Sequence, residues 1–206
     1  MIPETSLVGA GSPLLAPDPQ LGSLVTLLGS LTGLDAQQSG VRDSMLAFAS
    51  HNPDSLHRSC ADGHFTGSAL VVEQGTGRVL MLFHTKLRKW LQPGGHTDGE
   101  ATMAATALRE ATEETGIDDL RVLTEPIDLD IHEVRPPAEP PHLHHDLRYL
   151  VVAAQGSLPI GNHESESIRW VRPEEVASLD VDESVLRLVR NGLAVARTVP
   201  EAGIPS

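Results

Sequence analysis

The sequence predicts an α/β domain with a mixed sheet, preceded by an N-terminal helical extension. Three observations support this prediction. Strand-like and helix-like segments alternate from about residue 63 onward, which favours an α/β arrangement. A hairpin pattern opens that region, and the segment before it spaces its apolar residues as helices do. We therefore divide the chain into a tail with a helical extension, residues 1–60, and a main domain, residues 61–206.

The N-terminal region contains apolar stripes but no recognisable chemistry. Residues 1–20 are rich in Gly, Pro and Ser and are predicted to form a poorly ordered tail. Apolar spacing predicts helices over 21–31 and 41–49, joined around 33–40. Such stripes must be covered by the core or by a second subunit. We therefore expect a homodimer.

The first half of the main domain combines a hairpin with a helix. Two β-like runs, 66–74 and 78–85, flank the turn "GTG" and read as the hairpin. Residues 102–115 show the spacing of a helix, and Gly116 is placed to end it at the C′ position.

The second half contains further strands and a last helix. Residues 120–134 provide one or two strands, and the proline-rich stretch 135–145 is predicted to be an irregular loop. A strong strand follows at 146–155, then a short strand within 167–173 and a final helix over 181–197.

Composition and charge exclude several classes of partner. The formal net charge of −13 opposes binding to a nucleic-acid backbone, so we expect no stable nucleic-acid complex. The negative charge of the chain does not exclude a small phosphorylated substrate, because bound cations can make the electrostatic potential of the site positive. No apolar stretch is long enough to cross a bilayer, so no membrane partner is expected. Cys60 is the single cysteine; without an intramolecular disulfide, a cytoplasmic setting is natural.

One helix carries a cluster of acids directly behind a double glycine. In "REATEETG", Glu110, Glu113 and Glu114 lie on one side of the helix, although like charges at this spacing repel each other. Hard cations such as Mg²⁺ bind carboxylate oxygens and readily take substrate phosphates as further ligands. From the glutamates alone, a solvated acidic helix face is the favoured interpretation.

The whole string from the double glycine to "REATEETGI" decides between these readings, because it resembles the Nudix box, G-x5-E-x7-R-E-U-x-E-E-x-G-U. The matching positions are Gly95, Arg109, Glu110, Glu113, Glu114, Gly116 and Ile117. The resemblance implies an α/β/α sandwich. It also implies an enzyme that uses Mg²⁺ or Mn²⁺ to hydrolyse a nucleoside diphosphate linked to another moiety, with that small molecule as its partner.

The sequence departs from the box at two positions. Ala101 stands where the first glutamate of the box is expected, with Glu100 one place early, and Ala111 is small where a bulkier aliphatic residue is usual. If a shortened loop lets Glu100 replace the missing glutamate, Glu100→Ala should lower activity about tenfold. If Glu100 only caps the helix, the change should affect stability instead.

The resemblance also assigns roles within the box. Glu110, Glu113 and Glu114 are implied to hold the metal and to carry catalysis, together with the carbonyl of Gly95 or of the glycine before it. Arg109 is implied to orient a glutamate through a charge-assisted hydrogen bond.

Residues outside the box are weaker candidates. Members of the family often recruit a further acid from a later loop, and "NHESES" offers Glu164, which we prefer, or Glu166; an exposed acidic loop is the alternative. Substrate phosphates would meet a group of cations and one histidine beside the box, although a solvated basic turn fits the cations equally well. This group consists of Lys86, Arg88, Lys89 and His96.

The stretch "HLHHD" resembles a transition-metal site, because His142 and His144 would share one face of a strand. Without a matching second cluster in the sequence, a pocket-lining loop or a polar strand end is the favoured interpretation.

Two other functions compete with diphosphate hydrolysis. A Nudix-like isopentenyl diphosphate isomerase would need a catalytic cysteine in its pocket, whereas Cys60 precedes the first core strand without a matching motif. A non-catalytic nucleotide-binding Nudix module is the other candidate. Such modules usually lose box glutamates, and all three acids of "RExxEE" are present here.

Overall fold

The computed structural model describes residues 7–136, 139–162 and 165–204. Its helices are α1 (Leu21–Ser30), α2 (Ala36–His51), α3 (Met103–Thr115), α4 (Pro173–Val176) and α5 (Glu183–Ala196), with short 3₁₀ turns at Pro13–Leu15 and Pro200–Ala202. Its strands are β1 (Leu7–Gly9), β2 (Gly63–Glu73), β3 (Val79–His84), β4 (Trp90–Leu91), β5 (Gly94–His96), β6 (Arg121–Val134), β7 (His142–Ala153) and β8 (Ser165–Val171).

The described strands form one mixed sheet. Its order is β1-β6-β7-β2-β3-β4, with β5 attached to β2 and β8 to β3. Strands β2 and β7 run parallel along their whole paired length, from Gly63 opposite Leu143 to Glu73 opposite Ala153, whereas the other pairs are antiparallel. The predicted hairpin of β2 and β3 is therefore confirmed, and so is the mixed character of the sheet.

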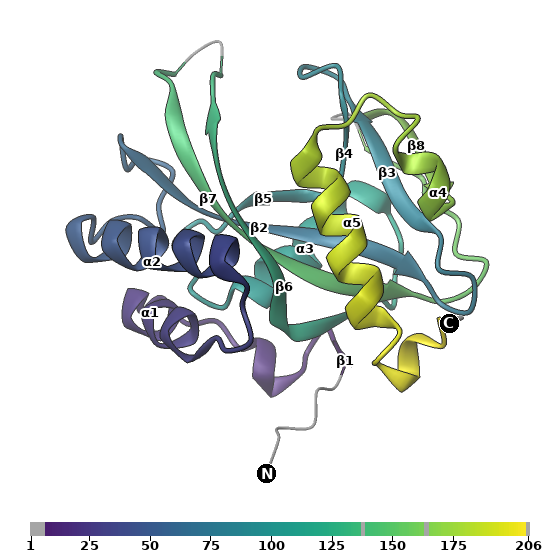
Figure 1. Cartoon of the computed structure of the whole chain (residues 1–206), viewed down its shortest axis with the longest axis horizontal. Coiled ribbons are helices and arrows are strands. Elements are labelled where there is room, and N and C mark those ends of the chain that lie inside the picture. The colour runs from purple at the N-terminus through teal and green to yellow at the C-terminus, as the bar shows by residue number, and fades with distance from the viewer. Residues whose placement is uncertain (1–6, 137–138, 163–164, 205–206) are drawn as a thin grey trace.

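Helices cover both faces of the sheet, which confirms the predicted α/β/α arrangement (Figure 1). One core joins α1, α2 and α3 to side chains of one strand face, such as Phe65 and Val71 of β2. The second core joins α5 to the alternate side chains of β2, Leu70 and Val72. This alternation follows from the period of two in a strand. Figure 1 shows α5 in front of the sheet and α3 behind it.

Helix α3 is close to its predicted span and ends as expected. Gly116 adopts φ 63°, and its N–H donates to the Thr112 carbonyl oxygen at 2.9 Å. This left-handed conformation strains residues with a side chain but not glycine, which is why a glycine ends the helix.

The prediction of a poorly ordered tail is wrong for residues 7–20. Strand β1 pairs with β6, with Leu7 opposite Leu123. The Ala101 N–H donates to the Asp18 carbonyl oxygen at 2.7 Å, so the segment also contacts the start of α3. Residues 1–6 lie outside the described part of the chain. Contacts with β6 and with Ala101, both distant in sequence, therefore order residues 7–20, although the composition of this segment favours disorder.

Two further boundaries differ from the prediction. Helix α2 begins at Ala36 rather than at residue 41, because Asp35 caps it by accepting a hydrogen bond from the Gln38 N–H at 2.8 Å. Strand β7 begins at His142, inside the stretch predicted to be a loop. Pairing with β2 satisfies the backbone there as soon as Pro141 is passed.

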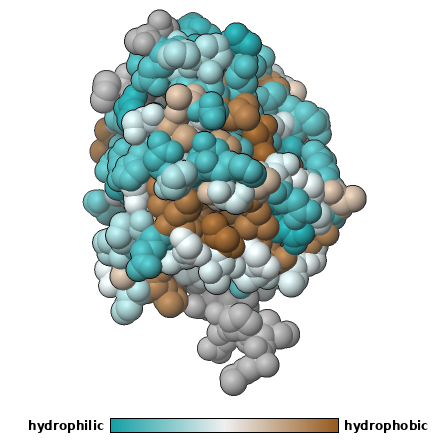
Figure 2. All heavy atoms as spheres, turned by 90° about the vertical axis from the view of Figure 1, so that its left-hand side faces the viewer, coloured by the Kyte–Doolittle hydropathy of each residue, from teal (hydrophilic) through white to brown (hydrophobic). Residues whose placement is uncertain are grey.

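The face formed by α1 and α2 is partly apolar. Figure 2 looks at this side of the molecule and shows hydrophobic side chains gathered near its centre. In α1, Leu24 and Leu28 point into the core, while Val25 is 36% exposed. Such a face is what a homodimer would need, and the homodimer stays a prediction. Every helix in the described residues is too short or too polar to cross a bilayer.

Candidate functional site

The carboxylates of α3 meet the double glycine of β5. Glu114 is buried, and its Oε2 accepts a hydrogen bond from the Gly94 N–H at 3.2 Å. The Glu110 side chain is 14% exposed, whereas that of Glu113 is 59% exposed. The structure therefore brings two of the three glutamates against the glycines and leaves the third on the solvent side.

Gly95 is in close contact with Glu110. A Cβ atom at position 95 would lie 2.5 Å from Oε2 and 2.8 Å from Oε1 of Glu110. A side chain would fill the space that the carboxylate occupies, so glycine is needed for the close approach. The position of the Glu110 carboxylate therefore depends on how β5 packs against α3, and not on helix geometry alone.

Arg109 links Glu110 to the end of β5. Its Nη1 lies 2.6 Å from Oε1 of Glu110 and 3.6 Å from Oε2 of Glu113. Its Nη2 donates to the carbonyl oxygen of His96 at 2.8 Å. These contacts fit the orienting role that the sequence pattern implied for Arg109.

Burial raises the pKa of Glu110 above its ordinary value, and the neighbouring Arg109 guanidinium opposes this shift. Desolvation disfavours the charged form of a carboxyl group. A cation beside Glu110 would therefore stabilise the charged form of a carboxylate that burial destabilises.

A cavity of about 800 Å³ opens beside these acids. Glu110, Glu114 and both glycines of β5 line it. The predicted substrate contacts Lys86, Lys89 and His96 line it too. Arg88 is not part of this lining: it forms an ion pair with Glu166 and lies over the Phe83 ring, 4.7 Å from its centroid.

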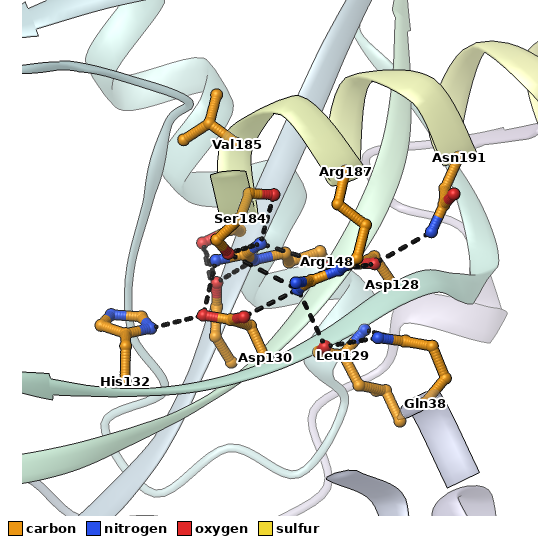
Figure 3. Close-up of polar contacts among 12 residues, drawn as sticks. Gln38, Asp128, Leu129, Asp130, His132, Arg148, Ser184, Val185, Arg187 and Asn191 are labelled. Carbon is orange, nitrogen blue, oxygen red and sulfur yellow. Dashed lines mark hydrogen bonds and ion pairs between the residues drawn. The ribbon is translucent and has the colours of Figure 1, made fainter. Parts of the chain in front are cut away.

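The sequence prediction missed a charged network (Figure 3), of which Asp130, Asp146 and Arg148 line the cavity. Arg148 is buried and contacts three aspartates, with distances of 2.8 Å to Asp146, 3.0 Å to Asp130 and 3.3 Å to Asp128. Arg187 of α5 bridges Asp128 at 2.9 Å and Asp130 at 2.7 Å. The positive charges of two arginines therefore hold three carboxylates in fixed positions.

Hydroxyl groups extend this network along β2. Thr66 donates to Asp146 at 3.0 Å, and Ser68 donates to the same carboxylate at 2.8 Å. Both hydroxyl-bearing residues line the cavity, as do Asp146 and Arg148. The cavity thus has a hydrogen-bonded polar floor in addition to the carboxylates of α3.

Five imidazoles gather at the same end of the sheet. His144 lies at the centre, with ring centroids 4.8 Å from His64, 5.4 Å from His142, 5.5 Å from His132 and 5.6 Å from His96. Burial lowers the pKa of His144 to about 2 and that of His64 to about 4, and neighbouring histidines add to both shifts. These rings are therefore uncharged at ordinary pH.

A period of two in the sequence was the signal for these missed residues. "DLDIHE" places Asp128, Asp130 and His132 on one strand face, and "HLHHDLR" does the same for a second strand. Polar residues at alternate positions of otherwise apolar strands indicate a shared polar face. The sequence alone does not say which strands bring these faces together.

Glu100 makes the contacts of a cap. Its Oε1 accepts hydrogen bonds from the Asp18 N–H at 2.5 Å and from the Thr102 N–H at 3.1 Å, while Ala101 is buried. It ties the N-terminal segment to the start of α3. These contacts support the capping alternative for Glu100.

Of two other sequence candidates, only Cys60 can be placed relative to the site. Glu164 lies outside the described residues. Cys60 is buried and does not line the cavity, and burial raises the pKa of its thiol. The thiolate form that a nucleophile needs is therefore disfavoured.

The oxygen-rich corner at α3 fits a hard divalent cation. Two carboxylates, Glu110 and Glu114, converge on a glycine backbone, and the Gly95 contact leaves no room for a competing side chain. Carboxylate and carbonyl oxygens are the ligands that Mg²⁺ and Mn²⁺ prefer. Glu113 extends toward solvent from the same helix.

Comparisons with known proteins agree with this geometry. A family model described as "NUDIX domain" matches residues 63–191. None of the curated proteins compared with the chain matches it.

Several solved structures share the fold. The C. elegans Ap4A hydrolase, in a binary complex, has 16% identity and a TM-score of 0.54, covering 65% of this chain and 98% of its own. The M. smegmatis Nudix hydrolase RenU has 22% identity and a TM-score of 0.52, covering 66% and 88%. The E. coli dihydroneopterin triphosphate pyrophosphohydrolase has 19% identity and a TM-score of 0.53, covering 64% and 95%.

Proposed function

Because the chain belongs to the NUDIX domain family, we propose that it is a metal-dependent hydrolase that cleaves the diphosphate bond of a nucleoside diphosphate derivative by water attack on phosphorus. The observation that supports this most is the meeting of Glu110 and Glu114 with the double glycine at the wall of a large cavity. The family supports a hydrolase of pyrophosphate bonds, and similar folds include hydrolases of Ap4A and of dihydroneopterin triphosphate.

Each residue of the corner has a separate task in this proposal. Glu110, Glu113, Glu114 and the Gly95 carbonyl would hold Mg²⁺ or Mn²⁺. Such a cation neutralises phosphate charge and makes water a better nucleophile near neutral pH. Arg109 positions Glu110 by its direct ion pair and holds the end of β5 through the His96 carbonyl.

The chain's own groups would bind and orient the substrate. Lys86 and Lys89 line the cavity and can meet phosphate oxygens. Thr66 and Ser68 are fixed by Asp146, so they offer polar contacts without first having to be ordered.

Two observations disfavour the competing functions. An isomerase of the isopentenyl diphosphate type needs a cysteine at the reacting carbon, and Cys60 is outside the cavity lining. A purely nucleotide-binding module usually loses box glutamates, whereas Glu110, Glu113 and Glu114 are all present here.

The deciding experiment measures Mg²⁺-dependent phosphate release over a panel of nucleoside diphosphate derivatives. Glu113→Gln and Glu114→Gln should each lower turnover about hundredfold, equivalent to roughly 3 kcal/mol of transition-state stabilisation. Glu125→Gln is the matched control, because Glu125 is exposed on β6. Near-normal turnover of both α3 variants under saturating Mg²⁺ would rule out the metal assignment.

A further inference from the structure

The histidine cluster contains a buried imidazole without a hydrogen-bonding partner. His64 is 1% exposed, and neither of its ring nitrogens makes a hydrogen bond within the described part of the chain. An unsatisfied buried polar side chain is costly, so it calls for an explanation such as an ion that the site is built to hold. The other histidines around it supply that explanation.

Three of the imidazoles are placed as a set of metal ligands. His64 of β2 lies directly opposite His144 of β7 in the parallel register, and His142 is two residues earlier on the same strand face. One ring nitrogen from each of the three lies within 4.8 Å of the other two. A tetrahedral zinc ion with Zn–N bonds of about 2.0–2.1 Å holds its nitrogens roughly 3.4 Å apart. Small side-chain rotations cover that difference.

The hydrogen bond of His142 engages Nδ1 and leaves Nε2 to act as the ligand atom. Its Nδ1 lies 2.9 Å from the carbonyl oxygen of Pro140. A carbonyl can only accept, so Nδ1 carries the proton and Nε2 presents a lone pair. Histidines that bind metals usually donate their second ring N–H to a carbonyl or carboxylate in this way.

We propose that His64, His142 and His144 form a second metal site, separate from the carboxylates of α3, for a borderline divalent ion such as Zn²⁺. Three imidazole ligands favour zinc-like ions over Mg²⁺, which prefers oxygen. His144 also lines the cavity. The fourth coordination position of a tetrahedral ion would therefore open toward the cavity, where water or a substrate oxygen can enter.

The test uses the full chain without a polyhistidine tag, stripped of metal and then titrated with Zn²⁺ in excess Mg²⁺. Magnesium occupies oxygen sites, so the titration reports on nitrogen ligands. We expect one Zn²⁺ per chain, with affinity lowered at least about tenfold in His142→Gln and in His144→Gln. The Co²⁺-loaded protein should show the intense visible absorption of a tetrahedral ion.

Two controls separate this site from its surroundings. His145 is adjacent to His144 but points to the opposite face, where it stacks on Phe48 with ring centroids 3.9 Å apart. His145→Gln should therefore keep Zn²⁺ affinity, and so should Glu110→Gln. Binding lost in Glu110→Gln, or kept in both His142→Gln and His144→Gln, would overturn the proposal.

A measurement on the unaltered protein guards against variants that fail to fold. X-ray absorption of the zinc-loaded chain should show about three imidazole ligands. Absence of zinc binding in excess Mg²⁺, or a zinc ion surrounded by oxygen alone, would overturn the proposal whatever the variants do. The readout does not depend on turnover, so the result stands whether or not the chain proves to be a hydrolase.

Discussion

Replacing Gly95 by alanine would place a methyl carbon 2.5 Å from Oε2 and 2.6 Å from Cδ of Glu110. Ordinary contact at such a position begins near 3.4 Å. The carboxylate must therefore retreat by about 0.9 Å, and a misplacement near 1 Å costs about hundredfold in rate. This corresponds to roughly 2.7 kcal/mol of transition-state stabilisation.

The fold should tolerate this change. Gly95 is not among the glycines with positive φ, and the atoms in the way belong to the end of a side chain rather than to the backbone. We expect the melting temperature of Gly95→Ala to stay close to that of the unaltered chain while its Mg²⁺-dependent phosphate release falls about hundredfold.

Gly29→Ala is a matched control in helix α1. An added Cβ there meets nothing within 4 Å, so the substitution should stabilise the helix by about 0.5–1 kcal/mol and leave turnover unchanged. Full turnover by Gly95→Ala at an unchanged melting temperature would refute the reasoning, because it would show that Glu110 does not need its observed position.

Two further substitutions test the contacts outside the carboxylate corner. Glu100→Ala should lower the free energy of unfolding by about 1 kcal/mol without changing the rate per folded molecule. Glu100→Gln can still accept both hydrogen bonds and should therefore keep the original stability. A tenfold lower rate at equal stability would instead show that Glu100 replaces the missing box glutamate. Arg78→Gln removes the guanidinium that holds the pKa of buried Glu73 at about 2, so stability near neutral pH should fall by about 2 kcal/mol. Because a lowered carboxyl pKa stabilises the fold above the ordinary value of 4.5 and that contribution is lost as pH falls toward about 2, thermal melts of the two proteins should converge over this interval; a constant gap would contradict the assignment.

The carboxylate helix could be predicted from the sequence because its chemistry is local. Glu110, Glu113 and Glu114 lie within one helical turn and a half, and Gly116 marks the end of that helix. The same spacing did not reveal that Glu113 faces solvent while Glu114 is buried against Gly94, because this difference depends on how α3 sits against β5.

The histidine cluster could not be assembled from the sequence. His142 and His144 were visible as a pair, but their partner His64 is set by the parallel register of two strands far apart in the chain. Likewise, the pairing of β1 with β6 gives order to residues whose composition favours a flexible tail. In both cases tertiary contacts decide what local patterns leave open.

The parallel pairing of β2 with β7 has a consequence for the order in which the chain can fold. Thr66 and Asp146, which hydrogen-bond across this pair, are 80 residues apart, so β2 leaves the ribosome well before its neighbour exists. Until β7 arrives, the strand presents unpaired backbone groups together with His64 and Ser68. Closing so long a loop is slow, and the part of the cavity lining that contains Asp146 and Arg148 forms only once it closes. A nascent or truncated chain ending before β7 would therefore have the glutamate helix but no binding cavity, and it would be exposed to aggregation through that open edge.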